Sequence, residues 1–328
     1  MGQLGLFGGN DRETGDSARN VAPDATLADQ YSRVRLLAQK LPFGIHFGTS
    51  SWTFPDWEGL VYPTGISERQ LRDQGLGWYS QHPLLTTVGV DSSYYRPPTP
   101  KTLRKYGEQL PAGFPCVMKV FSGLVQFADP RSHVVNPQFL SPALFEAEVL
   151  RPLMDEFAEH VGCLVFEFPP MKPPNLLSPS EFALRLDRFF SSISTEVQYG
   201  VELRNPEFLC QDYAQVVRKH NLAHVFNFWD CMPSLQRQWN KMHRATSGPI
   251  VLRLMLPPGQ KYSARKRELA PFNRVRDPQP VMRRHTLQIV KKAAESRRMA
   301  LVIVNNKAEG CSPLSIEELA LQLVTDGQ

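Results

Sequence analysis

Residues 163–203 read CLVFEFPPMKPPNLLSPSEFALRLDRFFSSISTEVQYGVEL, and the pattern in this stretch recurs along the chain. Its two ends, 163–168 and 197–203, are short and mostly apolar, and 178–191 between them carries apolar residues at helical spacing. A strand that is apolar on both sides indicates a parallel sheet covered on both faces. The stretch therefore predicts a strand–helix–strand unit whose two strands run parallel.

The same alternation runs through most of the chain. Strand-like runs lie at 45–49, 86–90, 115–120, 163–168, 197–203, 223–228, 250–255 and 300–304. Each is followed by a segment of helical periodicity, at 68–80, 100–109, 143–160, 178–191, 207–220, 232–244, 281–297 and 313–324. Eight such units are typical of a single closed (β/α)8 TIM barrel. The alternative is a doubly wound open sheet, but its GxGxxG turn is missing after the first strand.

Composition sets outer limits on the class of protein. The 328 residues suggest about two domains from length alone, although one barrel fills a similar length. An apolar share of 42% excludes global disorder, and no run of ~18 apolar residues predicts a membrane span. The net charge of +5 is compatible with an anionic partner. The N-terminus lacks the pattern of a secretory signal, so we expect a cytoplasmic protein. We divide the chain into a flexible arm, 1–26, and a barrel domain, 27–328.

Cysteine and histidine spacing gives no support to a metal centre. The five cysteines are far apart and include no CxxC pair, so we interpret them as structural thiols. The eight histidines form neither HxH nor HExxH. We predict no cofactor, although four acidic residues at strand ends are able to ligate a divalent metal ion: Asp91, Glu167, Glu202 and Asp230.

Polar and aromatic residues gather where the predicted strands end, which in this fold is the face that carries active sites. We interpret three of them as catalytic acid–base or orienting groups: Lys119, Glu202 and Asp91. The expected substrate-binding residues are Thr49, Ser50, Trp52, Ser92, Tyr94, Tyr95, Arg96, Arg204, Trp229, Arg253, Asn305 and Asn306. Charges within such apolar runs need partners, so the alternative is a structural ion-pair network such as Glu202 with Lys119 or Arg253. The aromatic residues, with Trp57, either rim a pocket or fill volume.

A basic segment follows the seventh strand. Residues 259–277, GQKYSARKRELAPFNRVRD, contain six lysines and arginines. Loops after the seventh and eighth strands are the recurrent phosphate site of these barrels, and such a cluster can also neutralise nucleic-acid phosphates. The alternatives are a lid over a small-molecule site and an ordinary solvated loop.

The extreme N-terminus carries a short apolar motif ahead of the polar segment 8–26. Residues 3–7 resemble the bacterial sliding-clamp-binding motif, with Gln3, Leu4, Leu6 and Phe7 at its anchor positions and glycine at the usual serine or aspartate position. The resemblance implies a sliding clamp as partner. The alternative is a tail that packs on the barrel's own surface.

Several motifs together resemble the DUF72, or YecE-like, family. They are GTSSW at 48–52, DWEG at 56–59, YP at 62–63, DSSYYRP at 91–97, MK at 118–119, FEFPP at 166–170, VELR at 201–204, LRL at 252–254 and NN at 305–306. The resemblance covers about residues 43–325 and implies a TIM barrel of unestablished activity, similar to endonuclease IV-like enzymes. The chain departs from the family pattern at Asp91, where glutamate is usual, at Glu167, where glutamine is usual, and in lacking the Thr-His after Lys119.

Three hypotheses of function follow. The first is a barrel that binds or acts on a phosphate-containing substrate, DNA above all, and is recruited to replication or repair by residues 3–7. In it, Lys119 and Arg253 hold phosphate and the aromatic residues stack a base. The second is a small-molecule lyase, isomerase or hydrolase that uses the same pocket on a sugar phosphate or carboxylate. The third is a non-catalytic clamp-associated adaptor.

Overall fold

The strands form a closed parallel barrel. The structure, a computed structural model, describes residues 25–326. Within this range neighbouring strands pair in sequence order, and the last strand pairs with the first over five residues. The strands are β1 Ile45–Thr49, β2 Leu85–Val90, β3 Cys116–Lys119, β4 Val161–Glu167, β5 Tyr199–Glu202, β6 Ala223–Phe228, β7 Ile250–Leu254 and β8 Ala300–Val304. The predicted (β/α)8 barrel is therefore confirmed.

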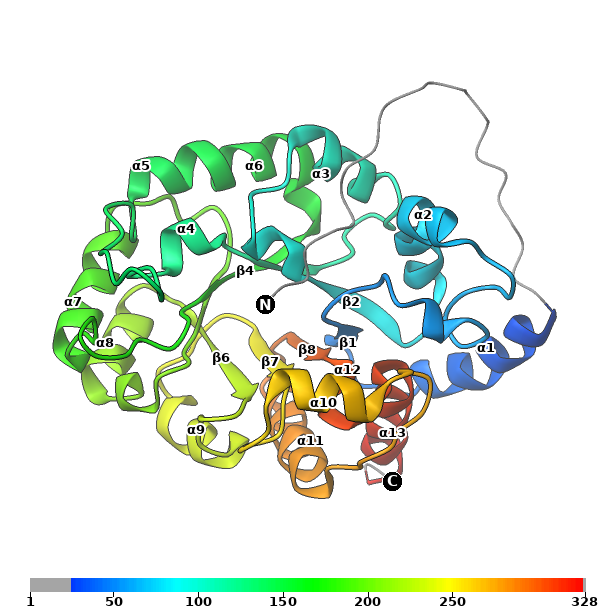
Figure 1. The fold of residues 1–328 in the computed structure, drawn as a ribbon. Helices are drawn as coiled ribbons and strands as arrows, with labels where there is room; N and C mark the ends of the chain where they lie inside the picture. Colours follow the sequence, from blue (N-terminus) through cyan, green and yellow to red (C-terminus); the bar gives the residue numbers. More distant parts are fainter. Residues whose placement is uncertain (1–24, 327–328) are drawn as a thin grey trace.

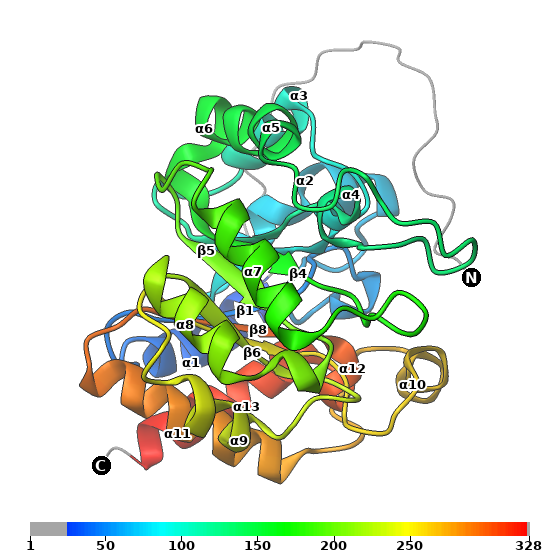
Figure 2. The ribbon, with the colours of Figure 1, turned by 90° about the vertical axis from the view of Figure 1, so that its left-hand side faces the viewer.

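Helices surround the strands, as Figure 1 shows. The helices are α1 Ala25–Ala38, α2 Glu68–Gln81, α3 Pro100–Gly107, α4 Ser122–Val125, α5 Pro142–Phe145, α6 Arg151–Phe157, α7 Pro179–Phe190, α8 Gln211–Lys219, α9 Leu235–Met242, α10 Tyr262–Leu269, α11 Pro280–Glu295, α12 Asn306–Glu309 and α13 Ser312–Thr325. A π-helical turn, Glu146–Leu150, joins α5 to α6. Figure 2 places α10 and α12 at one end of the barrel, where the strands finish.

The predicted arm lies almost wholly outside the described residues. Helix α1 begins at Ala25, two residues before the expected boundary of the barrel domain. The clamp-like motif, with Gln3, Leu4, Leu6 and Phe7, also lies outside the described residues. Between residues 25 and 326, no helix combines the length and the apolar character needed to span a bilayer.

The barrel interior is filled by small, mostly branched side chains. A compact apolar cluster within it consists of Val117, Cys163, Val165, Ala223, Val225, Val251, Leu301 and Ile303. The alternate strand residues face outward and pack against the helices, because successive side chains in a strand point to opposite faces. At Gly48 a Cβ atom would lie 1.9 Å from the carbonyl oxygen of Thr87, so β1 and β2 approach too closely for any side chain there.

Candidate functional site

A polar layer lies directly above the apolar filling of the barrel, at the ends of the strands. Its members are Asp91, Lys119, Glu167, Glu202, Asn227, Arg253 and Asn305. Several follow an interior residue by two positions, as Arg253 follows Val251 and Glu167 follows Val165. Since side chains two apart share one face of a strand, these charges point into the barrel mouth. We call this group, with Arg204, the mouth cluster.

Arg253 lies at the centre of the mouth cluster. Its guanidinium binds both carboxylate oxygens of Asp91, at 2.8 and 2.9 Å, and its Nη1 lies 2.5 Å from Glu167 Oε2. The same nitrogen also donates to Glu202. Only 1% of Arg253 is exposed. Burial alone would lower the pKa of Arg253, but the three carboxylates raise it above its usual value, so the guanidinium stays charged.

Glu167 joins the remaining cations to this centre. Its Oε2 atom lies 3.0 Å from Lys119 Nζ and 3.0 Å from Arg204 Nη2. Burial raises the pKa of Glu167, but Arg204, Lys119 and Arg253 together hold it well below its usual value. Lys119 also lies 3.4 Å from Asp91, and Arg204 lies 2.6 Å from Glu202. Three carboxylates thus balance three cations.

These ion pairs agree in part with the structural ion-pair network that the sequence left open as the alternative to a binding pocket. Glu202 pairs with Arg253, as the ion-pair alternative anticipates, whereas Lys119 pairs with Asp91 and Glu167 rather than with Glu202. The pairing is incomplete at Arg204, whose buried Nε and Nη1 have no hydrogen-bond partner among residues 25–326. Unsatisfied buried donors cost free energy, so such a group calls for an explanation, and a ligand that accepts from it is one.

Two aromatic side chains lie against the cations. The Arg204 guanidinium carbon is 3.8 Å from the centre of the Trp229 ring, and Lys119 Nζ is 5.3 Å from the centre of the Tyr94 ring. Tyr95 meets Tyr94 edge to face and is 77% exposed. Trp229, Tyr94 and Tyr95 are therefore near the rim, as predicted from the strand ends.

Trp52 and Trp57 do not rim the mouth, contrary to the pocket interpretation. Both are buried, with Trp52 edge to face against Tyr106 and Trp57 stacked on Tyr62. Their rings fill volume between the barrel and its helices, which is the alternative that the sequence left open.

The small polar residues at the ends of β1 and β8 are bound to one another or to the backbone. Thr49 Oγ1 donates to the Ser51 carbonyl, and Asn305 Nδ2 donates to Ser50 Oγ at 2.7 Å. The Asn306 side-chain oxygen accepts from the backbone and the hydroxyl of Ser312, at the start of α13. These contacts fix the end of β8 to its neighbours. Ser92 and Arg96 are exposed beside the mouth, in and after the 3₁₀ turn Asp91–Tyr94.

The basic segment 259–277 contains a helix, α10, fastened to the barrel by a buried arginine. Arg265 donates from Nε to the carbonyl of Lys307 at 3.1 Å and from Nη2 to the carbonyl of Ala308 at 3.2 Å. It also pairs with Asp277 at 2.6 Å. The segment is therefore neither a wholly solvated loop nor uniformly available to a partner. Its exposed cations are Lys261, Lys266, Arg267 and Arg274.

Lys307 stands with Asn305 and Asn306 at the end of the eighth strand in the sequence, where no role was predicted for it. It lies in α12, just after β8, and is 4% exposed. Its Nζ is 4.2 Å from the centre of the Tyr262 ring, on α10. Burial and the nearby Lys266 lower the pKa of Lys307 to about 8, against an opposing effect of Asp91. Its place directly after Asn305-Asn306 was the available signal, but its burial could not be read from the sequence.

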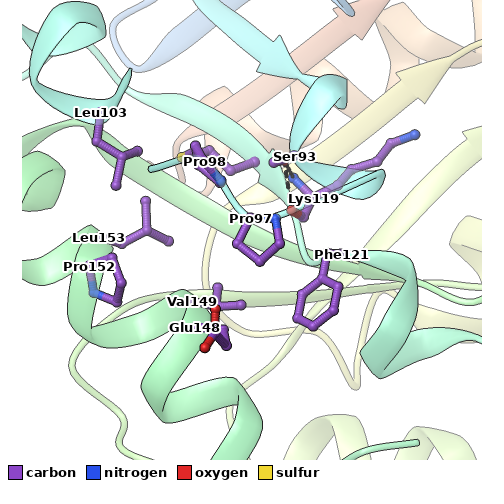
Figure 3. Close-up of a pocket in the computed structure, with 11 residues that line it drawn as sticks. Ser93, Pro97, Pro98, Leu103, Lys119, Phe121, Glu148, Val149, Pro152 and Leu153 are labelled. Atoms are coloured by element: carbon purple, nitrogen blue, oxygen red, sulfur yellow. Dashed lines mark hydrogen bonds between the residues drawn. The ribbon is translucent and has the colours of Figure 1, made fainter. Parts of the chain in front are cut away.

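Hollows elsewhere in the structure are less suited to chemistry. A cavity of about 10 Å³ between β3 and the helices α3 and α6 is lined mainly by apolar side chains, including Leu103, Val149 and Leu153. That volume is roughly the space needed by one water molecule. Figure 3 shows the amine of Lys119 pointing away from these residues. A larger hollow of about 450 Å³ lies on the outside, between α11 and α13.

The acidic residues of the mouth cluster are occupied by cations. Within residues 25–326, no three histidine, cysteine or acidic side chains are arranged to hold a metal ion. Asp230, a further potential ligand, is exposed and accepts a hydrogen bond from the Gly259 amide at 2.9 Å.

Comparison with known proteins supports the fold and the sequence resemblance. Residues 46–328 match the family described as "Protein of unknown function DUF72". A DUF72 family protein from Enterococcus faecalis V583 is 14% identical, with a TM-score of 0.57 over 86% of this chain and 95% of that chain. One from Thermotoga maritima MSB8 is 14% identical, with a TM-score of 0.55 over 86% of this chain and 98% of that chain. These structural similarities concern the fold alone. No curated protein matches this chain.

Proposed function

The chain belongs to the DUF72 family, and we propose that its barrel mouth binds a phosphate-containing ligand and acts on it by acid–base chemistry. The proposal concerns the mouth cluster and the two lysines beside it, Lys307 and Lys266. These residues lie on the face of the barrel that carries the active site in other enzymes of this fold.

A surplus of positive charge at the mouth carries the proposal. The mouth cluster is balanced, but Lys307 and Lys266 add two cations close enough for Lys266 to lower the pKa of Lys307. Neither lysine has a carboxylate oxygen within 4.0 Å among residues 25–326. Two unpaired like charges repel each other, and an anion bound between them relieves that repulsion. A phosphate carries charge and oxygen acceptors suited to this role.

The cluster divides into accessible and buried groups. The side chains of Lys119 and Asp91 are 11% and 25% exposed, whereas Glu202 is fully buried. We therefore assign Lys119 to a phosphate oxygen and Asp91 to proton transfer. Glu202 holds Arg204 and Arg253 in position and does not itself reach the ligand.

DNA is the phosphate-containing ligand that the exposed cations of 259–277 favour. Lys261, Lys266, Arg267 and Arg274 extend the positive charge outward from the mouth, as a polymer with repeated phosphates requires. Tyr95 and Trp229 offer ring faces to an unstacked base. In this proposal the protein acts in the cytoplasm and residues 3–7 recruit it to a sliding clamp.

The test is binding of fluorescent single-stranded DNA across a salt series. Four or five neutralised phosphates predict a slope of about −3 in log affinity against log salt. Replacing Lys261, Lys266 and Arg267 together with alanine should reduce that slope by about 2. Arg218→Ala is the matched control, because Arg218 is exposed near the end of α8, at the opposite end of the barrel. Absence of salt-dependent binding at low ionic strength would refute DNA as the ligand.

A separate pull-down tests recruitment. Purified sliding clamp should be retained by the full chain and lost on the double substitution Leu6→Ala/Phe7→Ala. Equal retention by both proteins would remove the clamp from the proposal while leaving the mouth untouched.

A further inference from the structure

The amine of Lys307 is enclosed at the barrel mouth without an anionic partner. Its Nζ has one nearby hydrogen-bond acceptor, Asn305 Oδ1, at 3.4 Å. No carboxylate oxygen of residues 25–326 lies within 4.0 Å of it, in contrast to Lys119, which has two carboxylate partners. Burial has cost this lysine the hydration of its charge, and in return it has one long hydrogen bond and contacts to aromatic rings rather than a counterion.

Two aromatic rings lie close to this amine. The centre of the Tyr262 ring is 4.2 Å from Nζ, and the centre of the Phe272 ring is 5.7 Å away. Tyr262 is half exposed, so its ring separates the amine from solvent. Arg265 holds this cover in place by binding the backbone carbonyls of Lys307 and Ala308.

The charged groups around Lys307 come from two sides. Lys266, on the same helix as Tyr262, disfavours the ammonium form, and Asp91, at the end of β2, favours it. With a pKa of about 8, roughly 10% of the amine is neutral at pH 7, compared with about 0.03% for an ordinary lysine. Burial beside another cation is a recurrent means of activating a lysine as a nucleophile.

We propose that Lys307 is a nucleophilic amine that forms a Schiff base with the carbonyl carbon of a phosphate-bearing aldehyde. The inference rests on the proposed function and adds the class of substrate. The amine nitrogen forms a bond to the carbonyl carbon, and the carbon–oxygen bond breaks. The oxygen leaves as water with the two amine hydrogens, and no oxidant or reductant is consumed. Asp91 is the carboxylate near enough to influence the charge on Lys307.

Two classes of compound carry an aldehyde and a phosphate together. One is a small sugar phosphate in its open-chain form, and the other is the ring-opened deoxyribose of an abasic site in DNA. Both place an aldehyde near a phosphate. The experiment therefore uses glycolaldehyde phosphate and a single-stranded oligonucleotide with one abasic site as separate probes, and unphosphorylated glycolaldehyde as the comparison.

The full-length protein is incubated with each probe and sodium cyanoborohydride, which reduces a Schiff base to a stable secondary amine, and the modified lysines are located by peptide mass spectrometry. At pH 7 we expect Lys307 to react more than about tenfold faster than the exposed Lys40, which lies before β1. Lys307→Met should abolish that adduct, and circular dichroism checks its folding. Lys266→Gln should slow the adduct and shift its pH dependence upward. Lys292→Gln, at an exposed lysine near the end of α11, should change neither.

The outcomes separate this inference from the proposed function. A faster reaction of Lys307 with a phosphorylated probe than with glycolaldehyde supports both. Equal rates for all probes at Lys307 support the reactive amine and refute phosphate binding. Modification of Lys40 with none at Lys307 refutes the reactive amine. If inorganic phosphate raises the Tm of the same protein, phosphate binding survives that result. The faster of the two phosphorylated probes identifies the source of the aldehyde.

Discussion

Removing Arg253 should destabilise the protein strongly, because it leaves buried carboxylates without their common partner. Arg253→Met keeps much of the side-chain volume but removes contacts to Asp91, Glu167 and Glu202. Only Lys119 and Arg204 then remain against three carboxylates. Breaking a buried ion pair costs about 3–5 kcal/mol of unfolding free energy. With an unfolding entropy of about 2.1 cal/mol/K per residue, that loss lowers the Tm of a 328-residue chain by roughly 4–7 °C.

Urea denaturation followed by tryptophan fluorescence and by circular dichroism measures this loss. The double substitution Arg253→Met/Glu202→Gln restores the charge balance, and we expect it to recover about 1–2 kcal/mol relative to Arg253→Met alone. If Arg253→Met unfolds within about 1 kcal/mol of the original protein, the mouth cluster is not a coupled, buried network and the reasoning is wrong.

Three further predictions concern pH and the cover of the mouth. The pKa of Glu167 in the folded protein lies below its usual 4.5, so the ionised carboxylate stabilises the fold above about pH 4.5 and this contribution is lost on acidification. Urea titrations from pH 6 to pH 3 should show a smaller fall in unfolding free energy for Glu167→Gln than for the original protein. The pKa of Lys307 is about 8 in the folded protein rather than 10.5, so below pH 8 its ammonium destabilises the fold by on the order of 3 kcal/mol. Lys307→Met should therefore raise the unfolding free energy at pH 7. An equally large increase at pH 10.5 would show that the buried ammonium is not its cause. Arg265→Met should speed amide hydrogen exchange in Tyr262–Leu269 while Ile250–Leu254 stays protected; unchanged exchange in the helix would show that Arg265 does not fasten it.

The barrel could be predicted because its signal is repeated and local. Runs such as 163–168 and 250–255 are mostly apolar on both sides, and that pattern, repeated eight times between helical segments, favours a parallel sheet with two covered faces. The polar layer also follows from local spacing, since Arg253 lies two positions after the interior residue Val251. The sequence therefore located the charged residues at the mouth without any knowledge of their contacts.

The pair of Glu202 with Arg253 was anticipated, but the other ion pairs could not be predicted, because they depend on distances across the barrel. Glu167 meets three cations from three other strand ends, and no sequence spacing records that meeting. Exposure was equally hidden. Trp52 and Tyr95 both lie a few residues after a strand end, yet Trp52 is buried and Tyr95 is largely exposed.

The basic segment 259–277 shows the same limit. Its lysines and arginines look equivalent in the sequence, but Arg265 is buried against backbone carbonyls while Lys266 is exposed near the Lys307 amine. The distinction arises from the helix α10, which places the two side chains in different surroundings. The burial of Lys307 could not be predicted for a related reason, since its cover comes from that distant segment.

Hydrogen–deuterium exchange with and without a 5′-phosphorylated oligonucleotide tests the central claim most directly, because it locates the bound phosphate. We predict slower exchange in Asp91–Tyr94, Tyr262–Leu269 and Asn306–Glu309, the segments that surround the mouth. Substituting Lys119→Met should weaken that protection, and Arg218→Ala should not. Protection confined to Pro280–Glu295, beside the outer hollow, or no protection at a concentration that saturates binding, would contradict a phosphate site at the barrel mouth.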